Sequence, residues 1–227
     1  MKGLQRLLSA LAGIAMLIIL LISSFEIGAY SNFGWYEKNY AKYNVLDDLE
    51  MEMSDVMQVT KEMMSYLRGN RADLEVDTKV DGEEREFFND REKAHMVDVK
   101  NLFVGGLWIR RGAILVMVIS IVLLIRTKAD WKRLLPKSFL ITIGSFIGIT
   151  LAAGVLFMTD FHRYFMIFHE IFFTNDLWLF DARYDYMIRM LTEGFFADMV
   201  LRILLFFLVF LGGTFTLMQI WKRYKRR

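Results

Sequence analysis

Three histidines are the side chains in this sequence best suited to proton transfer near neutral pH, and they occur in two segments. His162 and His169 belong to residues 161–181, a stretch in which eight of the first twenty residues are aromatic, and His95 stands earlier in the chain. Imidazole is the side chain whose unperturbed pKa suits acid–base work at neutral pH. His162 and His169 are seven residues apart, so a helix would place them on one face. All three stand close to long apolar runs. We therefore expect them to meet at one membrane surface.

Other chemistry is less well supported by the residue pattern. A metal site could use the three histidines with Asp98 or Glu170, but neither HxxxH nor HExxH spacing occurs. A serine nucleophile lacks the GxSxG motif, and the chain has no cysteine. For each histidine the simplest alternative is an interfacial side chain that only satisfies a hydrogen bond.

Four apolar runs must position these side chains. Of the 227 residues, 55% are apolar, and runs of this length are typical of transmembrane helices. We predict spans at residues 1–25, 104–125, 138–158 and 200–220. The first run could also be a signal peptide, but it is long enough to span and no convincing small-x-small cleavage site follows it.

Charged residues are segregated between the segments that join the spans. The 126–137 loop and the 221–227 tail are rich in Lys and Arg, whereas residues 26–103 hold 18 acidic and 10 basic residues and residues 159–199 hold seven acids and three arginines. The positive-inside rule then places both termini in the cytoplasm and both acidic segments outside. We predict an all-α-dominated integral membrane protein with four transmembrane helices. Its extracytoplasmic cap is formed by the two insertions, 26–103 and 159–199, and includes a small β-hairpin.

Several local elements can be predicted inside the first insertion. Residues 45–67 have apolar positions at helical spacing and end at Gly69-Asn70, a helix-terminating pair. Residues 74–80 alternate and precede Asp81-Gly82, a turn signal for a hairpin. Residues 83–100 read as another helix. We expect an aromatic cluster at the headgroup interface, comprising Tyr30, Phe33, Trp35, Tyr36, Tyr40 and Tyr43.

The spans themselves carry few polar groups. Arg110 and Arg111 fall one to two turns inside the second span, where a cation must reach the interface, pair, or meet a polar group of a lipid substrate. The third span is rich in small residues such as Gly144 and Gly148, which allow helices to approach closely in lipid. The absence of charge near the middle of the spans disfavours a transporter.

Three stretches of the chain resemble the bacterial lipoprotein intramolecular transacylases, small four-helix membrane proteins. They are HMVDVKNLF (residues 95–103), FHEIFFTNDLWLFD (residues 168–181) and, more weakly, MLTEGFF (residues 190–196). The resemblance implies transfer of the sn-2 acyl chain of a diacylglyceryl-cysteine lipoprotein to the α-amino group of its own N-terminal cysteine. It implies that His95 and His169 carry the reaction at the cap–membrane interface, without a cofactor or metal.

The same resemblance implies partners and a location. Diacylglyceryl-modified bacterial lipoproteins would be the substrate, membrane lipids the surroundings, and nucleic acid no partner. The protein would be a multi-pass protein of the bacterial cytoplasmic membrane, with its site on the outer face. Asp98 could hold the second nitrogen of His95, and further expected substrate contacts are Arg110, Arg111, His162, Asn175 and Trp178. The alternative function is a non-enzymatic extracytoplasmic sensor or partner-binding membrane protein.

Overall fold

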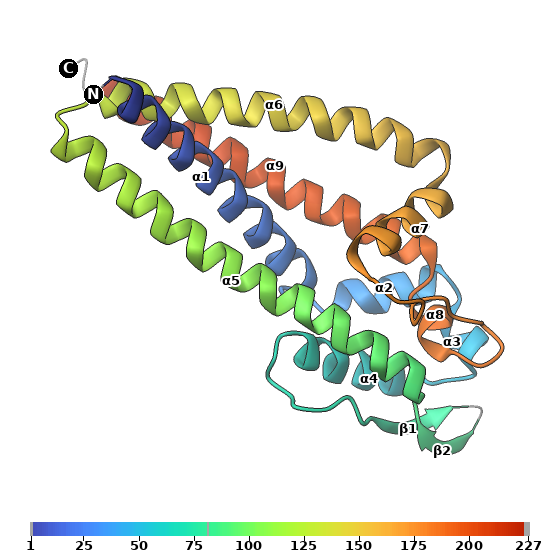
Figure 1. Ribbon diagram of the computed structural model, residues 1–227. Helices are drawn as coiled ribbons and strands as arrows, with labels where there is room; N and C mark the ends of the chain where they lie inside the picture. The colour runs from blue at the N-terminus through green and yellow to red at the C-terminus, as the bar shows by residue number, and fades with distance from the viewer. Residues whose placement is uncertain (1, 81, 225–227) are drawn as a thin grey trace. The chain divides into compact units, whose positions relative to one another are not determined.

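The computed structural model describes residues 2–80 and 82–224, with backbone only at 152–158, 161 and 221–224. Helices dominate, and the strands form a single two-stranded antiparallel sheet in these ranges. The elements are α1 (Lys2–Tyr30), α2 (Gly34–Lys42), α3 (Val45–Leu49), α4 (Met53–Leu67), β1 (Asp77–Val80), β2 (Glu83–Glu86), α5 (Asp90–Arg126), α6 (Trp131–Thr159), α7 (Phe161–Phe172), α8 (Tyr186–Met190) and α9 (Glu193–Tyr224) (Figure 1).

Four helices in the described ranges are long and apolar enough to cross a membrane. They lie at Lys2–Tyr30, Asp90–Arg126, Trp131–Leu151 and Glu193–Ile220. This confirms the predicted fold class of an all-α-dominated membrane protein with four spans and a small hairpin. With 37 residues α5 is about 55 Å long, nearly twice the hydrocarbon thickness of a bilayer. Its charged N-terminal part, before Gly106, therefore extends beyond the spanning segment.

One predicted helix was wrong, and two long helices extend beyond the predicted spans. We expected a separate helix over residues 83–100 and a span beginning near residue 104, but α5 runs unbroken from Asp90. Residues 83–86 instead form strand β2. The fourth long helix begins at Glu193 rather than at residue 200. In α5 and α9 polar turns precede the apolar run, so each helix is longer than the span that we predicted within it.

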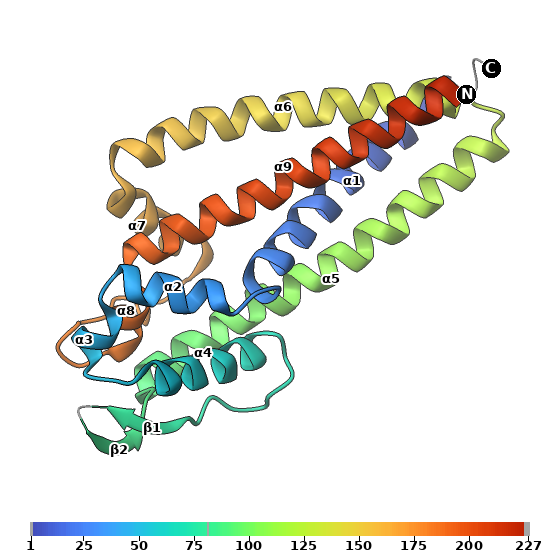
Figure 2. The ribbon, with the colours of Figure 1, turned by 180° about the vertical axis from the view of Figure 1, so that it is seen from behind.

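The chain forms two compact units. Unit 1 comprises Met1–Gly28, Gly106–Thr159 and Arg202–Arg227, and unit 2 comprises Ala29–Gly105 and Asp160–Leu201. Within unit 1, Figure 2 shows α1, α6 and α9 coming together, and one apolar cluster joins all three helices. Its buried members are Leu17, Leu20, Phe139, Ile143 and Phe207.

Close helix approach in unit 1 does not use Gly144 or Gly148, two of the small residues that we predicted. A Cβ atom on Gly144 or Gly148 would meet nothing within 4 Å. Instead a Cβ on Gly13 would lie 3.0 Å from Thr142, and one on Gly28 would lie 2.9 Å from Ile203. The α1 glycines therefore permit the tight contacts with α6 and α9.

Unit 2 has a core of its own, in which part of the predicted interfacial aromatic cluster is buried. Tyr36 is 2% exposed and Tyr40 is fully buried. Both rings pack on Phe195, with ring centres 5.6 and 5.8 Å away. The Tyr40 hydroxyl also forms a 2.7 Å hydrogen bond with Thr60. These two tyrosines are core residues rather than headgroup anchors, because α9 supplies an aromatic partner.

The predicted 45–67 helix is interrupted between α3 and α4. Asn44 and Glu50, which flank α3, adopt left-handed backbone conformations with φ of 53° and 48°. The end of α4 agrees with the prediction: Gly69 has φ +84°, and its N–H donates to the Tyr66 carbonyl while that of Asn70 donates to the Ser65 carbonyl. This pair of bonds is a Schellman motif, which satisfies carbonyls at the helix end.

The hairpin that we predicted next to this helix is present. β1 and β2 pair antiparallel in a register that sets Asp77 opposite Glu86 and Val80 opposite Glu83. Gly82 has φ +76°, the conformation that the turn requires of a glycine. Asp81, the other half of the turn signal, lies outside the described residues.

A close approach also holds the start of α9 in unit 2. A Cβ atom on Gly194 would lie only 2.4 Å from the ring of Tyr43. The Tyr43 hydroxyl in turn donates a 3.0 Å hydrogen bond to Asp198, which also pairs with Lys42. Glycine at position 194 thus allows α9 to pack directly on this ring.

Candidate active site

His95 lies in the second turn of α5, inside unit 2, and is 4% exposed. Its ring meets Phe173 and Phe180 edge-on, with ring centres 5.0 and 5.4 Å away. Its Nδ1 atom is buried without a hydrogen-bond partner. Burial lowers the pKa of His95 to about 4, the neighbouring His169 adds to this effect, and Asp98 opposes it. His95 is therefore neutral at physiological pH.

His169 lies in the last turn of α7. The Asp160 side chain accepts the Arg163 backbone N–H at 3.1 Å and so caps the first turn of this amphipathic helix. Nδ1 of His169 lies 2.7 Å from the Phe165 carbonyl oxygen. A carbonyl only accepts, so Nδ1 carries the proton and Nε2 keeps its lone pair. Burial lowers the pKa of His169, although the Phe165 bond opposes the shift.

The structure brings these two imidazoles together. Their ring centres are 6.1 Å apart, and Phe173 contacts both rings. Trp178 stacks on His169 at 4.9 Å and 28°. Phe165 and Phe168 also contact the His169 ring. The result is a pair of neutral acid–base groups inside an aromatic wall.

Two other predicted residues lie beside this pair, but Asp98 does not play the predicted part. Its carboxylate accepts a 2.9 Å hydrogen bond from the Asn175 side chain, and no such bond joins it to His95. Asn175 also orders its own turn, because its side-chain oxygen accepts the Leu177 N–H and its carbonyl accepts the Trp178 indole N–H at 2.7 Å. Asp98 and Asn175 therefore support the loop that carries Trp178.

The third histidine is not part of this arrangement. The His162 side chain is 68% exposed, and its Nδ1 donates a 2.6 Å hydrogen bond to Glu193. This partner raises the pKa of His162, the opposite of the shift at His95 and His169. Although His162 and His169 are seven residues apart on one helix, the first imidazole is exposed and the second is buried.

The two arginines of the second span belong to unit 1. Arg110 pairs with Glu26 on α1, and its guanidinium also lies 3.5 Å from the Ser23 hydroxyl. The guanidinium of Arg111 lies over the exposed Trp108 ring, 4.5 Å from its centre. An intramolecular ion pair thus accounts for Arg110, and the substrate contact expected for either arginine stays a prediction.

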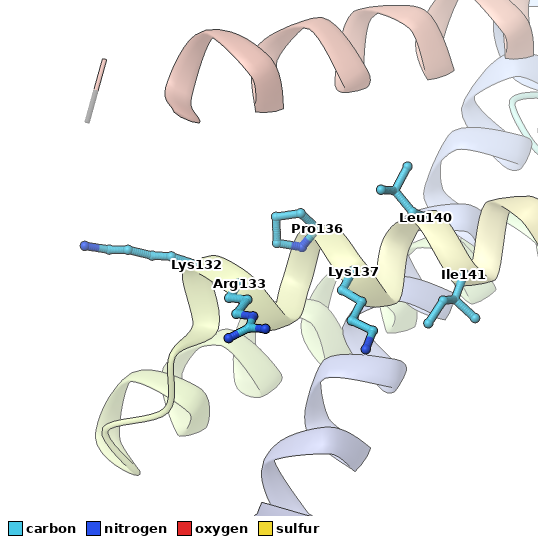
Figure 3. A pocket seen from close by; sticks show the side chains of 6 residues that line it. All are labelled: Lys132, Arg133, Pro136, Lys137, Leu140 and Ile141. Carbon is cyan, nitrogen blue, oxygen red and sulfur yellow. The ribbon is translucent and has the colours of Figure 1, made fainter. Parts of the chain in front are cut away.

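Two surface hollows of the described structure are not lined by a histidine. One, of about 440 Å³, lies along the first turns of α6 and is lined by Lys132, Arg133, Pro136, Lys137, Leu140 and Ile141 (Figure 3). The other, of about 600 Å³, is lined by four acidic residues between 46 and 55 together with Leu46, Met51, Lys79 and Gly82. Among the residues described, no three His, Cys, Asp or Glu side chains are grouped so that they could hold a metal ion.

Sequence reasoning missed three residues around the pair. Phe173 and Phe180 were visible only as part of an aromatic-rich stretch, and no spacing rule indicates which aromatic residue faces an imidazole. Glu92, one turn before His95, is fully buried. Asn89 three residues before it is the sequence signal of a helix capping box, which could have revealed this position.

The fold and the site together define a class: multi-pass helical membrane proteins with two buried, neighbouring histidines. A family model described as lipoprotein intramolecular transacylase Lit matches residues 10–196, most of the chain, and the chain belongs to this family. It is accordingly an enzyme, a membrane-integral transacylase, as the resemblance implied.

Solved structures agree on the fold. The membrane-integral lipoprotein intramolecular transacylase Lit from Bacillus cereus, determined in meso, has a TM-score of 0.75 and 21% identity over 99% of this chain and 100% of that one. Two variants of that protein, in which a histidine is replaced by alanine or by arginine, give TM-scores of 0.75 and 0.76 at the same identity. They cover 99% of this chain and 96% and 95% of theirs. No curated protein matches the sequence significantly.

Proposed function

We propose that this transacylase moves the sn-2 acyl chain of a diacylglyceryl-cysteine lipoprotein onto the α-amino group of the same cysteine. The observation that carries the proposal is the pair of buried, neutral imidazoles, His95 and His169, with ring centres 6.1 Å apart. Acyl transfer to an amine needs a group that removes a proton from nitrogen and returns one to oxygen. It also needs a donor for the developing oxyanion.

His169 is assigned the proton transfers. Its Nδ1–H is held by the Phe165 carbonyl, so Nε2 is the free base. As the cysteine nitrogen bonds to the ester carbonyl carbon, Nε2 accepts the proton that the nitrogen loses. When the bond from that carbon to the sn-2 glyceryl oxygen breaks, the same proton passes to this oxygen. The enzyme ends the cycle unchanged.

His95 is assigned a role as hydrogen-bond donor. Its Nδ1 is buried without a partner, which a lone pair tolerates better than an N–H does. The proton of the neutral ring then sits on Nε2, where it can donate to the carbonyl oxygen as negative charge develops. His95 gives no proton away, because loss of the only ring proton would leave an imidazolate.

The aromatic wall and the substrate itself supply the remaining selectivity. Phe173, Phe180 and Trp178 surround the pair with apolar surface, which disfavours a competing water nucleophile. Donor and acceptor belong to one molecule, so ordering that molecule into a cyclic arrangement raises the effective concentration of the amine.

The location of the reaction is also a proposal. The basic 126–137 loop and the 221–227 tail favour cytoplasmic termini, with residues 26–103 and 159–199 on the outer face of a bacterial cytoplasmic membrane. Lipoproteins anchored in that membrane would then reach the site laterally from the outer leaflet. Membrane lipids would surround the spans.

Expression in a bacterial host that accumulates diacyl lipoproteins tests the proposal. Mass spectrometry should show that the cysteine amine gains an acyl chain while the S-glyceryl group loses the sn-2 chain. Lipoproteins that keep both glyceryl esters and a free amine would contradict it. Activity should persist with a metal chelator.

Single histidine variants test the assignment of roles. We expect His169→Ala and His95→Ala each to lower the rate by roughly a hundredfold or more. His162→Ala should change it only a few-fold, because that ring is exposed and paired with Glu193. Full conversion by the His95→Ala, His169→Ala double variant would show that the site lies elsewhere.

A further inference from the structure

The N-termini of α5 and α8 are joined by three polar side chains, Asn89, Glu92 and Asp185, which we call the latch. Asn89 and Glu92 form a reciprocal capping box: the Glu92 N–H donates to Asn89 Oδ1 at 3.0 Å, and the Asn89 N–H donates to Glu92 Oε2 at 2.9 Å. Capping accounts for one carboxylate oxygen of Glu92 and leaves the other free for a second partner.

That second oxygen reaches a distant part of the chain. Glu92 Oε1 accepts the backbone N–H of Met187, in the first turn of α8, at 2.6 Å. Asn89 Nδ2 donates to Asp185 Oδ1 at 2.7 Å, and Asp185 Oδ2 accepts the Asp181 N–H at 2.6 Å. Glu92 is fully buried and Asp185 is 5% exposed. A buried carboxylate is costly unless satisfied, so these bonds are worth more than their surface equivalents.

The latch holds the C-terminal end of a functional loop against the helix that carries His95. Residues 173–185 lead from α7 to α8 and supply Phe173, Trp178 and Phe180 to the histidine pair. Arg91, next to Glu92, donates to the carbonyls of Asp176 and Leu177 in the middle of this loop. The first turn of α5 thus fixes the loop at two places.

We propose that Glu92 is a positioning residue for transacylation: through the latch it sets the 173–185 loop, and hence the aromatic wall, against His95 and His169. This inference rests on the proposed function of the histidine pair. Glu92 touches neither imidazole in the contacts described, so it acts through the loop.

The latch requires Glu92 to be ionised. A carboxylate can accept both the Asn89 and the Met187 N–H, whereas a carboxamide or a carboxylic acid presents one good acceptor and one donor. Burial raises the pKa of Glu92 to about 7, Asp185 adds to this, and the two N–H bonds oppose it. The latch should therefore weaken as pH falls through about 7, while His95, whose pKa is lowered to about 4, is still neutral.

Charges around Glu92 are otherwise compensated. Asp185 is the one charged side chain that raises its pKa directly. Asp181, whose N–H is bound by Asp185, pairs with Arg183 at 2.5 Å. On the helix itself Lys93 pairs with Glu86 at 2.8 Å.

The test compares Glu92→Gln with Asp90→Asn in the full-length protein in detergent. Asp90 stands on the same turn but its side chain is fully exposed. The probe is a synthetic peptide with an N-terminal S-diacylglyceryl cysteine. We expect Glu92→Gln to slow transacylation roughly tenfold or more at pH 8 and Asp90→Asn to stay within about twofold. Wild-type activity should fall as pH drops through about 7. The Glu92→Gln variant should not show this fall near pH 7, so that its activity declines only at lower pH.

Hydrogen exchange separates positioning from other causes. In Glu92→Gln, peptides covering residues 173–190 should exchange faster while α4 and α9 exchange as in the wild type. Asp185→Asn keeps the shape of the side chain and should give the same faster exchange of residues 173–190. Agreement between the two variants would show that the effect does not come from misfolding of one of them. Unchanged activity, or lost activity with unchanged loop exchange, would overturn the inference. Inactive wild-type protein would instead refute the proposed function, while the exchange measurement would still decide on the latch.

Discussion

At the scale of single residues, His95 links the chemistry to the stability of the protein. Its pKa is lowered to about 4 in the fold, against an ordinary value of 6.5. The unfolded chain therefore binds more protons between these pH values, and the contribution of His95 to stability is present above pH 6.5 and lost as pH falls toward 4.

The first prediction follows from this linkage. Replacing His95→Gln should flatten the dependence of the unfolding temperature on pH across that window, removing about 3 kcal/mol of pH-dependent free energy. Glu92 has the opposite effect on the pH dependence of stability, because its pKa is raised and its contribution to the free energy of unfolding falls as pH rises. The measurement is therefore the difference between wild type and variant in thermal unfolding from pH 4 to 7. Identical slopes would show that His95 is not buried neutral.

At the scale of elements, the end of α4 depends on one backbone conformation. Gly69 adopts φ +84° in the Schellman motif. In Gly69→Ala the new side chain is strained in this conformation, which should lower the free energy of unfolding by about 1 to 2 kcal/mol. Gly105→Ala is the matched control: this glycine lies in α5 with nothing within 4 Å of a Cβ, so alanine should stabilise by about 0.5 to 1 kcal/mol. Chemical denaturation of the two variants would measure both effects. Equal changes in the free energy of unfolding would contradict the requirement for a positive φ at Gly69.

At the scale of the whole molecule, membrane orientation can be tested because the chain has no cysteine. The test uses two single-cysteine variants, one for each predicted side of the membrane. One carries cysteine at Glu84, in the exposed strand β2, and the other at Lys132, in the hollow of Figure 3. A membrane-impermeant maleimide should label Glu84→Cys in intact cells, and Lys132→Cys only after permeabilisation. The reverse pattern would invert the proposed topology.

Elements that depend on local composition were predicted well from sequence. The four spans follow from runs of apolar residues, the hairpin from its turn residues, and the end of α4 from Gly69. Each signal lies within a few residues of the feature it determines.

Features that depend on distant partners could not be predicted. Tyr36 and Tyr40 read as interfacial because Phe195, which buries them, is more than 150 residues away in the chain. Asp98 read as a partner of His95 because it lies one turn away, yet Asn175 from another segment takes its carboxylate. Helical spacing shows which side chains can meet, and tertiary packing decides which do.

The contact of Gly194 with Tyr43 has a consequence for how this sequence can vary. The ring stands where any β-carbon at position 194 would be, and Asp198 holds the hydroxyl in place. In a saturation library at this position, glycine alone should survive selection for folded protein. A substitution at Tyr43 to a smaller residue should widen the set of accepted residues, so that the two positions vary together.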